Sequence, residues 1–143
     1  MENQKIKTTT IFVDTSAFKA LIDFSDDFNS QARKLWGRLS KQKQPVLTTN
    51  FVLDETYTLL RVRLGREPAI KFKQRINISP GFKRPQRVLA QDEVEAWKFF
   101  KELPGRGVSY TDCTSFAVMK RLGLIEVFTF DRDFARAGFK VLP

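Results

Sequence analysis

The sequence predicts an α/β fold in which helices cover both faces of a mainly parallel sheet. Two observations support this fold class. Short apolar, strand-like runs alternate along the chain with longer segments of helical periodicity. Hydrophobic residues make up 42% of the chain, including fourteen Phe, which is enough for a packed core. We expect a single domain spanning residues 1–143, because no linker, repeat or low-complexity tract divides the chain.

The elements of the first half follow from apolar runs, capping residues and helix breakers. Residues 9–13 form an apolar run that ends at Asp14, which predicts a short buried strand followed by a helix-compatible segment. An amphipathic helix is predicted over 26–42, capped by an aspartate at 26 or 27. A second strand over 46–48 leads into a helix over 50–64, capped at 49 or 50 and ended by Gly65.

The second half continues the alternation. A short basic helix over 67–76 is followed by the turn-rich stretch SPGFKRP and a candidate strand over 87–90. A helix over 92–103 is expected to turn Val94, Trp97, Phe99, Phe100 and Leu103 largely inward. The remaining predicted elements are a helix from 110 or 111 to 122, a strand over 124–128, a short helix over 131–137 and a strand over 139–142.

Composition excludes several classes of protein. The chain has no His, so it has no Ser-His-Asp or Cys-His nucleophile and no zinc site built on imidazole. Its single Cys, Cys113, cannot form an internal disulfide and is expected to be a small buried apolar group. No apolar run reaches the length of about 18 residues that a membrane helix needs, and the start lacks the features of a secretory signal, so a cytoplasmic protein is expected.

Net charge points to a polyanionic partner. The chain carries +9 at pH 7, and nine basic side chains against one acid lie between residues 61 and 87. Lys and Arg that neutralise phosphates release condensed counterions, which makes nucleic acid the leading partner. The predicted RNA-binding residues are Arg61, Arg63, Arg66, Lys71 and Lys73. The alternative is an ordinary solvated basic face, or a surface for another protein.

Acidic residues follow strands or begin helices at four separate places. Asp14 ends the first strand, and Asp131 and Asp133 follow the strand over 124–128. Glu55 and Asp112 lie in the first turns of two helices. Because the carboxyl ends of parallel strands and the starts of the following helices share one edge of a sheet, these acids are expected to converge.

Each acid also has a purely structural explanation. Asp14, Asp112 and Asp131 can cap helices or interact with a helix dipole. Glu55 fits that explanation least well, because its register with Phe51 and Leu59 turns it inward and leaves Asp54 more exposed. A shared cation explains the whole set. Oxygen-only ligands suit Mg²⁺ or Mn²⁺, and such ions activate water and stabilise the leaving oxygen in phosphodiester hydrolysis.

The motifs that carry these acids resemble a known family. In order and spacing, they are similar to the motifs of PIN-domain ribonucleases, especially the small toxins of the VapC type. The four motifs are VDTSA with Asp14, TTNFVLDE with Glu55, SYTDCTSFAVMKRLG with Asp112, and FTFDRDF with Asp131 and Asp133. The resemblance covers about residues 9–142. It implies a three-layer α/β/α sandwich, a metal-dependent endoribonuclease, an antitoxin partner and a homodimer.

The resemblance also assigns roles to residues. Asp14, Glu55, Asp112 and Asp131 match the family's catalytic, metal-binding quartet, and Asp133 matches a frequent fifth metal ligand. Ser16 and Thr129 match hydroxyl residues that line the site. Two other functions remain open at this point: a stand-alone RNA-processing nuclease and a non-catalytic RNA-binding module on the same fold. A haloacid-dehalogenase-type phosphatase is disfavoured, because its second Asp is replaced by Ser16.

Overall fold

A four-stranded parallel sheet with the order β2-β1-β3-β4 runs through the middle of the molecule. The computed structural model describes residues 5–143. The strands are β1 (Ile11–Val13), β2 (Val46–Leu47), β3 (Glu126–Phe128) and β4 (Lys140–Leu142). The helices are α1 (Thr15–Ile22), α2 (Asn29–Lys41), α3 (Asn50–Leu64), α4 (Arg66–Asn77), α5 (Ala90–Glu102), α6 (Tyr110–Leu122) and α7 (Asp133–Arg136).

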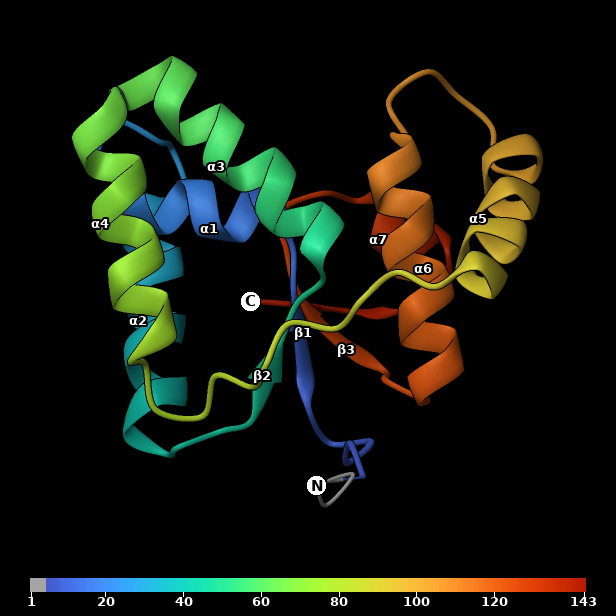
Figure 1. Cartoon of the computed structure of the whole chain (residues 1–143), viewed down its shortest axis with the longest axis horizontal. Coiled ribbons are helices and arrows are strands. Elements are labelled where there is room, and N and C mark those ends of the chain that lie inside the picture. The colour runs from blue at the N-terminus through green and yellow to red at the C-terminus, as the bar shows by residue number, and fades with distance from the viewer. Residues whose placement is uncertain (1–4) are drawn as a thin grey trace.

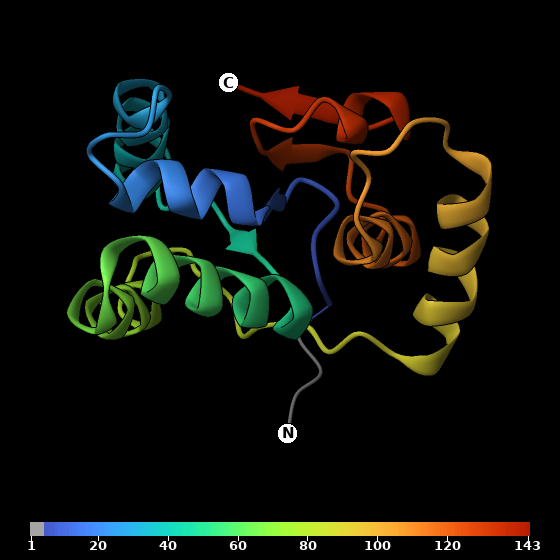
Figure 2. The ribbon, with the colours of Figure 1, turned by 90° about the horizontal axis from the view of Figure 1, so that it is seen from above.

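Helices lie on both sides of this sheet. Two perpendicular views place α1 to α4 on one side of the molecule and α5 and α6 on the other, with the strands between them (Figures 1 and 2). The predicted three-layer α/β/α architecture with a parallel sheet is therefore confirmed. None of the helices within residues 5–143 has the length and apolar character needed to cross a membrane.

Aromatic side chains fill the core. Phe12 and Phe128 are fully buried on the two central strands. Phe116 of α6 meets Phe134 of α7 edge to face at 4.8 Å between ring centroids, and Phe18 of α1 meets Phe72 of α4 in the same way at 5.1 Å. The predicted burial of Cys113 is also confirmed. The ring contacts pack α6 against α7, the helices at which Asp112 and Asp133 lie, and α1 against α4.

The start of one predicted helix differs in the structure, and the start of another is confirmed. Helix α2 begins at Asn29 rather than at 26, because Asp26 accepts the backbone N–H of Phe28 at 2.8 Å and pairs with Lys19 at 2.7 Å instead of capping the helix. Helix α3 begins as predicted, and Thr49 is its cap: its hydroxyl accepts the N–H of Val52 at 3.1 Å.

The predicted strand over 87–90 is wrong. Ala90 is the first residue of α5, because Asp92 accepts the N–H of Leu89 at 2.8 Å and so starts a helix there. The chain reaches the edge of the sheet a few residues earlier, where single parallel bridges join Phe82 to Val46 and Gln86 to Thr49.

The predicted inward face of α5 is wrong in part. Val94, Trp97 and Phe100 are exposed, whereas Phe99 and Leu103 do pack against the core. The helix is rotated because its buried face also carries Asp92, which Arg121 of α6 neutralises at 2.8 Å, and the small Ala96. Hydrophobic periodicity does not predict this face, because Asp92 is polar and would be placed outward although its ion pair is buried.

Candidate metal site and nucleic-acid interface

Asp14 lies at the carboxyl end of β1, where it caps α1. Its side chain is buried, with 2% of the residue exposed. One carboxylate oxygen, Oδ2, accepts hydrogen bonds from the hydroxyls of Thr129 at 2.9 Å and Ser16 at 3.0 Å. The other oxygen, Oδ1, is the only buried side-chain polar atom within residues 5–143 that lacks a hydrogen-bond partner. An unpaired buried carboxylate oxygen is costly, which makes it a ready ligand for a cation.

The surroundings of Asp14 change its acidity. Burial raises the pKa of this carboxyl from 3.8 to about 6, although the hydrogen bonds from Thr129 and Ser16 lower it. The nearby negative charge of Asp131 raises it further. Asp14 is therefore held ready to lose its proton near neutral pH, and a cation would favour that loss.

The loop after β3 is tied to α1 through two hydroxyl side chains. The hydroxyl oxygens of Ser16 and Thr129 lie 3.0 Å apart, and both face the same oxygen of Asp14. The hydroxyl of Ser16 accepts the N–H of Phe130 at 2.9 Å, and that of Thr129 accepts the N–H of Asp131 at 3.0 Å. This network fixes the loop that carries Asp131 beside Asp14. Ser16 and Thr129 thus lie next to Asp14, and their role in lining the site stays a prediction.

Asp112 lies in the first turn of α6. It forms a reciprocal capping box with Ser109, in which Asp112 accepts the N–H of Ser109 at 3.0 Å and the Ser109 hydroxyl accepts the N–H of Asp112 at 3.0 Å. Burial raises the pKa of Asp112 to about 8, and the charges of Asp14 and Asp131 raise it too. Asp112 therefore does cap its helix, which was the purely structural explanation for this residue. Capping alone does not explain why its carboxyl lies among other acids.

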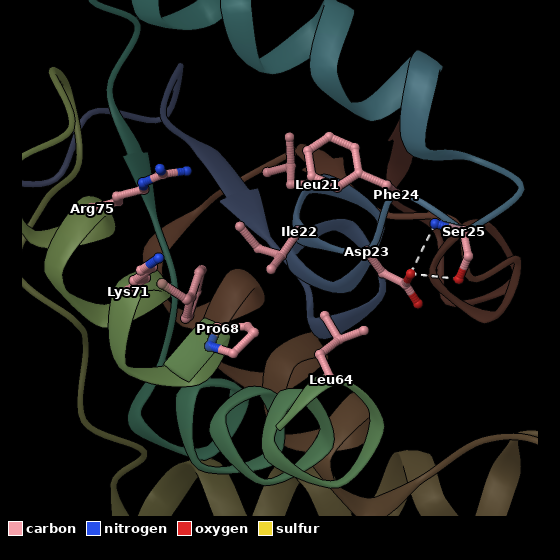
Figure 3. A pocket seen from close by; sticks show the side chains of 10 residues that line it. Leu21, Ile22, Asp23, Phe24, Ser25, Leu64, Pro68, Lys71 and Arg75 are labelled. Carbon is pink, nitrogen blue, oxygen red and sulfur yellow. Dashed lines mark hydrogen bonds between the residues drawn. The ribbon is translucent and has the colours of Figure 1, made fainter. Parts of the chain in front are cut away.

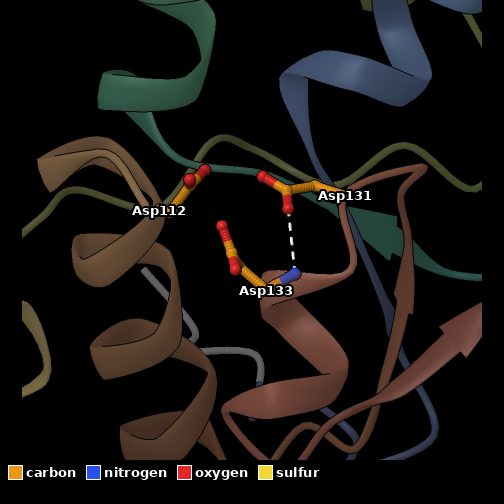
Figure 4. Close-up of side chains that lie close together, drawn as sticks. All are labelled: Asp112, Asp131 and Asp133. Carbon is orange, nitrogen blue, oxygen red and sulfur yellow. Dashed lines mark hydrogen bonds between the residues drawn. The ribbon is translucent and has the colours of Figure 1, made fainter. Parts of the chain in front are cut away.

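Three carboxylates meet at one point. Oxygen atoms of Asp112, Asp131 and Asp133 lie within 4.8 Å of one another, and the side chains converge from α6 and from the start of α7 (Figure 4). Asp131 accepts the N–H of Asp133 at 2.9 Å, and Arg136 pairs with Asp133 at 3.1 Å. Like charges at this spacing repel unless a proton or a cation is shared among them.

Glu55 lies on α3, outside this group of three. It is half-buried and Asp54 is exposed, as the sequence predicted. Helix α3 contacts α6, and a buried hydroxyl pair joins it to α1: Thr15 bonds the carbonyl of Val52 at 3.4 Å, and Thr56 bonds the Thr15 hydroxyl at 3.3 Å. This network holds the second turn of α3 close to Asp14. The assignment of Glu55 as a ligand stays a prediction.

The predicted RNA-binding residues lie on the exposed outer parts of α3 and α4. Arg61, Arg66 and Lys73 line a hollow of about 430 Å³, and Arg63 is exposed on the last turn of α3. Lys71 lines a different groove of about 490 Å³ between α1 and α4, whose apolar lining includes Leu21, Ile22 and Leu64 (Figure 3). None of the acids predicted for the metal site lines that groove.

Sequence reasoning missed two side chains that support the acids. Ser109 fixes Asp112, and its signal was present as the Ser-Tyr-Thr-Asp spacing of a capping box. Arg136 neutralises Asp133 from three residues further along α7, a helical spacing that the sequence also contained.

The donor set suits a hard divalent cation. The group of three consists of carboxylate oxygens without His or Cys. The unpaired buried oxygen belongs to Asp14, which lies outside that group but near enough for its charge to raise the pKa of Asp112. Asp112, Asp131 and Asp133 would hold such an ion together with Asp14. The ion, when bound, would activate water and stabilise negative charge on a phosphate oxygen. The chain's own contribution is to fix the carboxylates through Ser16, Thr129 and Ser109 so that they remain in place when ionised.

Comparisons with known proteins agree with this geometry. The PIN-domain family model matches residues 11–140. The 23S rRNA-specific endonuclease VapC20 of Mycobacterium tuberculosis is 40% identical over 130 residues, which cover 90% of this chain and 95% of the relative. The crystal structure of M. tuberculosis VapC20, described as a sarcin-ricin loop cleaving toxin, matches with a TM-score of 0.78 and 38% identity over 90% of this chain and 95% of that one. The chain therefore belongs to the PIN-domain family.

Proposed function

We propose that this protein is a metal-dependent endoribonuclease and the toxin of a toxin-antitoxin pair. The observation that carries the proposal is the meeting of Asp112, Asp131 and Asp133 within 4.8 Å, beside the unpaired buried oxygen of Asp14. Family membership and the match to VapC20 support the reaction type. Mg²⁺ or Mn²⁺ is the expected cofactor, held by these four carboxylates and by Glu55.

The proposed substrate is a structured ribosomal RNA loop. VapC20 is named for 23S rRNA cleavage, and its crystal structure is described as that of a sarcin-ricin loop cleaving toxin. This chain matches it over nearly the full length of both proteins. The basic side chains of α3 and α4 supply phosphate contacts, since α4 alone carries four basic residues and one acid.

We also propose that one nuclease domain spans residues 1–143, that the protein forms a homodimer, that an antitoxin protein restrains it, and that it acts in the cytoplasm.

A cleavage assay with matched variants tests the reaction. Purified protein is incubated with ribosomes or with a synthetic sarcin-ricin loop RNA, in Mg²⁺ or Mn²⁺ and in excess chelator. We expect one major cut, lost with the chelator and lost in Asp14→Asn. Asp54→Asn is the control, because Asp54 is exposed and lies next to the predicted ligand Glu55. Cleavage that persists in both the chelator and Asp14→Asn would mean that the acids do not act through a metal.

RNA binding is tested separately from cleavage. In the Asp14→Asn background, Arg61→Gln, Arg63→Gln and Arg66→Gln combined should weaken binding to all RNAs. The slope of log affinity against log salt should flatten by about one unit for each phosphate that the protein no longer neutralises. An unchanged affinity and slope would remove these residues from the RNA interface.

A further inference from the structure

A pair of stacked aromatic rings lies beside the acidic site. The rings of Phe28 and Phe130 are nearly parallel, with 4.5 Å between their centroids and 9° between their planes. Phe130 comes directly before Asp131, and its N–H donates to the Ser16 hydroxyl, which itself bonds the carboxylate of Asp14. The proposed metal site and the basic side chains of α3 and α4 use neither ring.

The aromatic series runs from the core out to solvent. Phe128, at the end of β3, is fully buried and meets Phe130 edge to face at 6.0 Å. Phe130 is partly buried against the core, whereas Phe28 is 43% exposed. Because Phe130 covers one face of the Phe28 ring, the opposite face is the one on which a further flat group can stack.

The backbone on both sides of Phe28 is fixed. The N–H of Phe28 donates to Asp26 at 2.8 Å, and the side-chain amide of Asn29 donates to the carbonyl of Ala20 at 2.7 Å. Asn29 is buried, so the residue after the ring is anchored to α1. A ring that is held in place before binding loses little conformational entropy when a ligand stacks on it, which favours a binding role.

The position of the ring favours RNA as its ligand. Helix α2 begins directly after Phe28 and carries four basic residues and no acid, and Arg132 is exposed between Asp131 and Asp133. Asp27 is an exposed acid next to the ring, so the flat ring itself, rather than a phosphate contact, selects the ligand. Unpaired RNA bases are commonly recognised by stacking on aromatic side chains.

We infer that the ring of Phe28 stacks on an unpaired base of the RNA substrate, close to the phosphate that the acidic site cleaves. Phe130 supports that ring from behind and joins it to the loop that carries Asp131. A stacked base fixes the strand relative to the acids, so the contact contributes to the choice of cleavage position as well as to affinity. The inference rests on the proposed endoribonuclease and adds a side chain that holds its substrate.

Binding to a synthetic sarcin-ricin loop RNA tests the stack. All proteins carry Asp14→Asn so that the RNA stays intact, and circular dichroism checks that each is folded. Phe28→Ala is expected to raise the Kd by at least about fivefold, the lower end of the range for loss of one base stack. Phe28→Trp keeps a flat ring and should bind at least as tightly as the parent. Phe28→Leu keeps only apolar bulk and should bind as weakly as Phe28→Ala.

Phe24→Ala is the matched control. Phe24 belongs to the same loop and is 77% exposed, but its ring faces the guanidinium of Arg33 instead of Phe130. The variant should therefore leave the Kd unchanged. A loss of affinity as large as that of Phe28→Ala would mean that the loop as a whole, and not the stacked ring, supports binding, and would overturn the inference.

RNA with single abasic positions shows whether a base is the ligand. Each unpaired nucleotide of the loop is replaced in turn. One replacement should weaken binding to the protein with Phe28 about as much as Phe28→Ala does, and should have no further effect on Phe28→Ala itself. The inference is overturned if the affinity does not depend on Phe28, if Phe28→Leu binds as the parent does, or if Phe28→Ala loses the same affinity with every abasic RNA as with the intact loop.

Cleavage by proteins that keep Asp14 separates this inference from the proposed function. Phe28→Ala should raise KM with a smaller change in kcat, because it removes a contact made before the reaction, and its cleavage should stay sensitive to the chelator. A base stack without any cleavage would refute only the proposed function. Wild-type cleavage together with an unchanged KM and Kd for Phe28→Ala would refute only the stack.

Discussion

Metal-free protein is predicted to lose stability as the pH rises from 5 to 8. The pKa of Asp14 is raised from 3.8 to about 6 by burial, and that of Asp112 to about 8 by burial and by neighbouring acids. A carboxyl with a raised pKa in the folded state favours folding while it is protonated, and that contribution is lost as the pH rises from its unfolded value through its folded value. Asp14 and Asp112 both act in this direction.

The size of the effect follows from the shift of Asp14 alone. A shift from 3.8 to about 6 corresponds to about 3 kcal/mol of stability lost between those two values, at 1.36 kcal/mol for each pKa unit. About 1 kcal/mol of that loss falls above pH 5, and Asp112 extends the loss toward pH 8. We expect the free energy of unfolding to fall by at least about 2 kcal/mol between pH 5 and pH 8.

This pH window contains few other titrating groups. The chain has no His. Asp23 and Glu95 have lowered pKa values, through bonds from Ser25 and Lys120 respectively, so the stability that they contribute is already complete at pH 5. The fall can therefore be assigned to the acidic site.

Urea denaturation in EDTA at several pH values measures this fall. Asp14→Asn should show a smaller fall and should be more stable than the wild type at pH 8, while it loses cleavage. Excess Mg²⁺ or Mn²⁺ should restore the wild type at pH 8 but not the variant. Asp54→Asn is the control and should behave as the wild type. A wild-type stability that stays level or rises from pH 5 to 8 in EDTA would contradict the assignment of raised pKa values to these acids.

Further predictions concern two glycines, Glu55 and Thr129. Gly81→Ala should destabilise the protein by at least about 2 kcal/mol, because the φ of Gly81 is +83° and a Cβ there would clash with the backbone oxygen of Gln44. Gly37 lies on a helix with open space around it, so Gly37→Ala should instead stabilise the protein by about 0.5–1 kcal/mol in the same denaturation assay. Glu55→Gln should lower the cleavage rate by at least about 100-fold while Asp54→Asn does not, and equal rates would remove Glu55 from the site. Thr129→Val removes a 2.9 Å hydrogen bond to the carboxylate of Asp14, so the pKa of Asp14 should rise and the acidic limb of the pH-rate profile should move to higher pH. An acidic limb that does not move would show that Thr129 does not affect the pKa of Asp14.

Apart from the strand expected over 87–90, the order of the elements could be predicted from the amino-acid sequence alone, and so could the meeting of acidic side chains at one place. Apolar runs and capping residues predicted the helix over 50–64 at its observed bounds, since both depend on interactions within a few residues of chain. Acids at strand ends and helix starts predicted convergence, because parallel strands end at one edge of a sheet. The absence of His left oxygen ligands as the basis for any metal site.

Which faces are buried and which acids meet depends instead on long-range packing. Helix α5 turned Trp97 outward because the ion pair between Asp92 and Arg121, which are 29 residues apart in the chain, occupies its inner face. The helix start at 90 is different, because the bond from Leu89 to Asp92 is local and its signal was present in the sequence. Asp112, Asp131 and Asp133 meet within 4.8 Å, whereas Asp14 and Glu55 lie outside that group of three. Pairing across elements depends on the distance in space between residues far apart in the chain, and local periodicity carries no information about that distance.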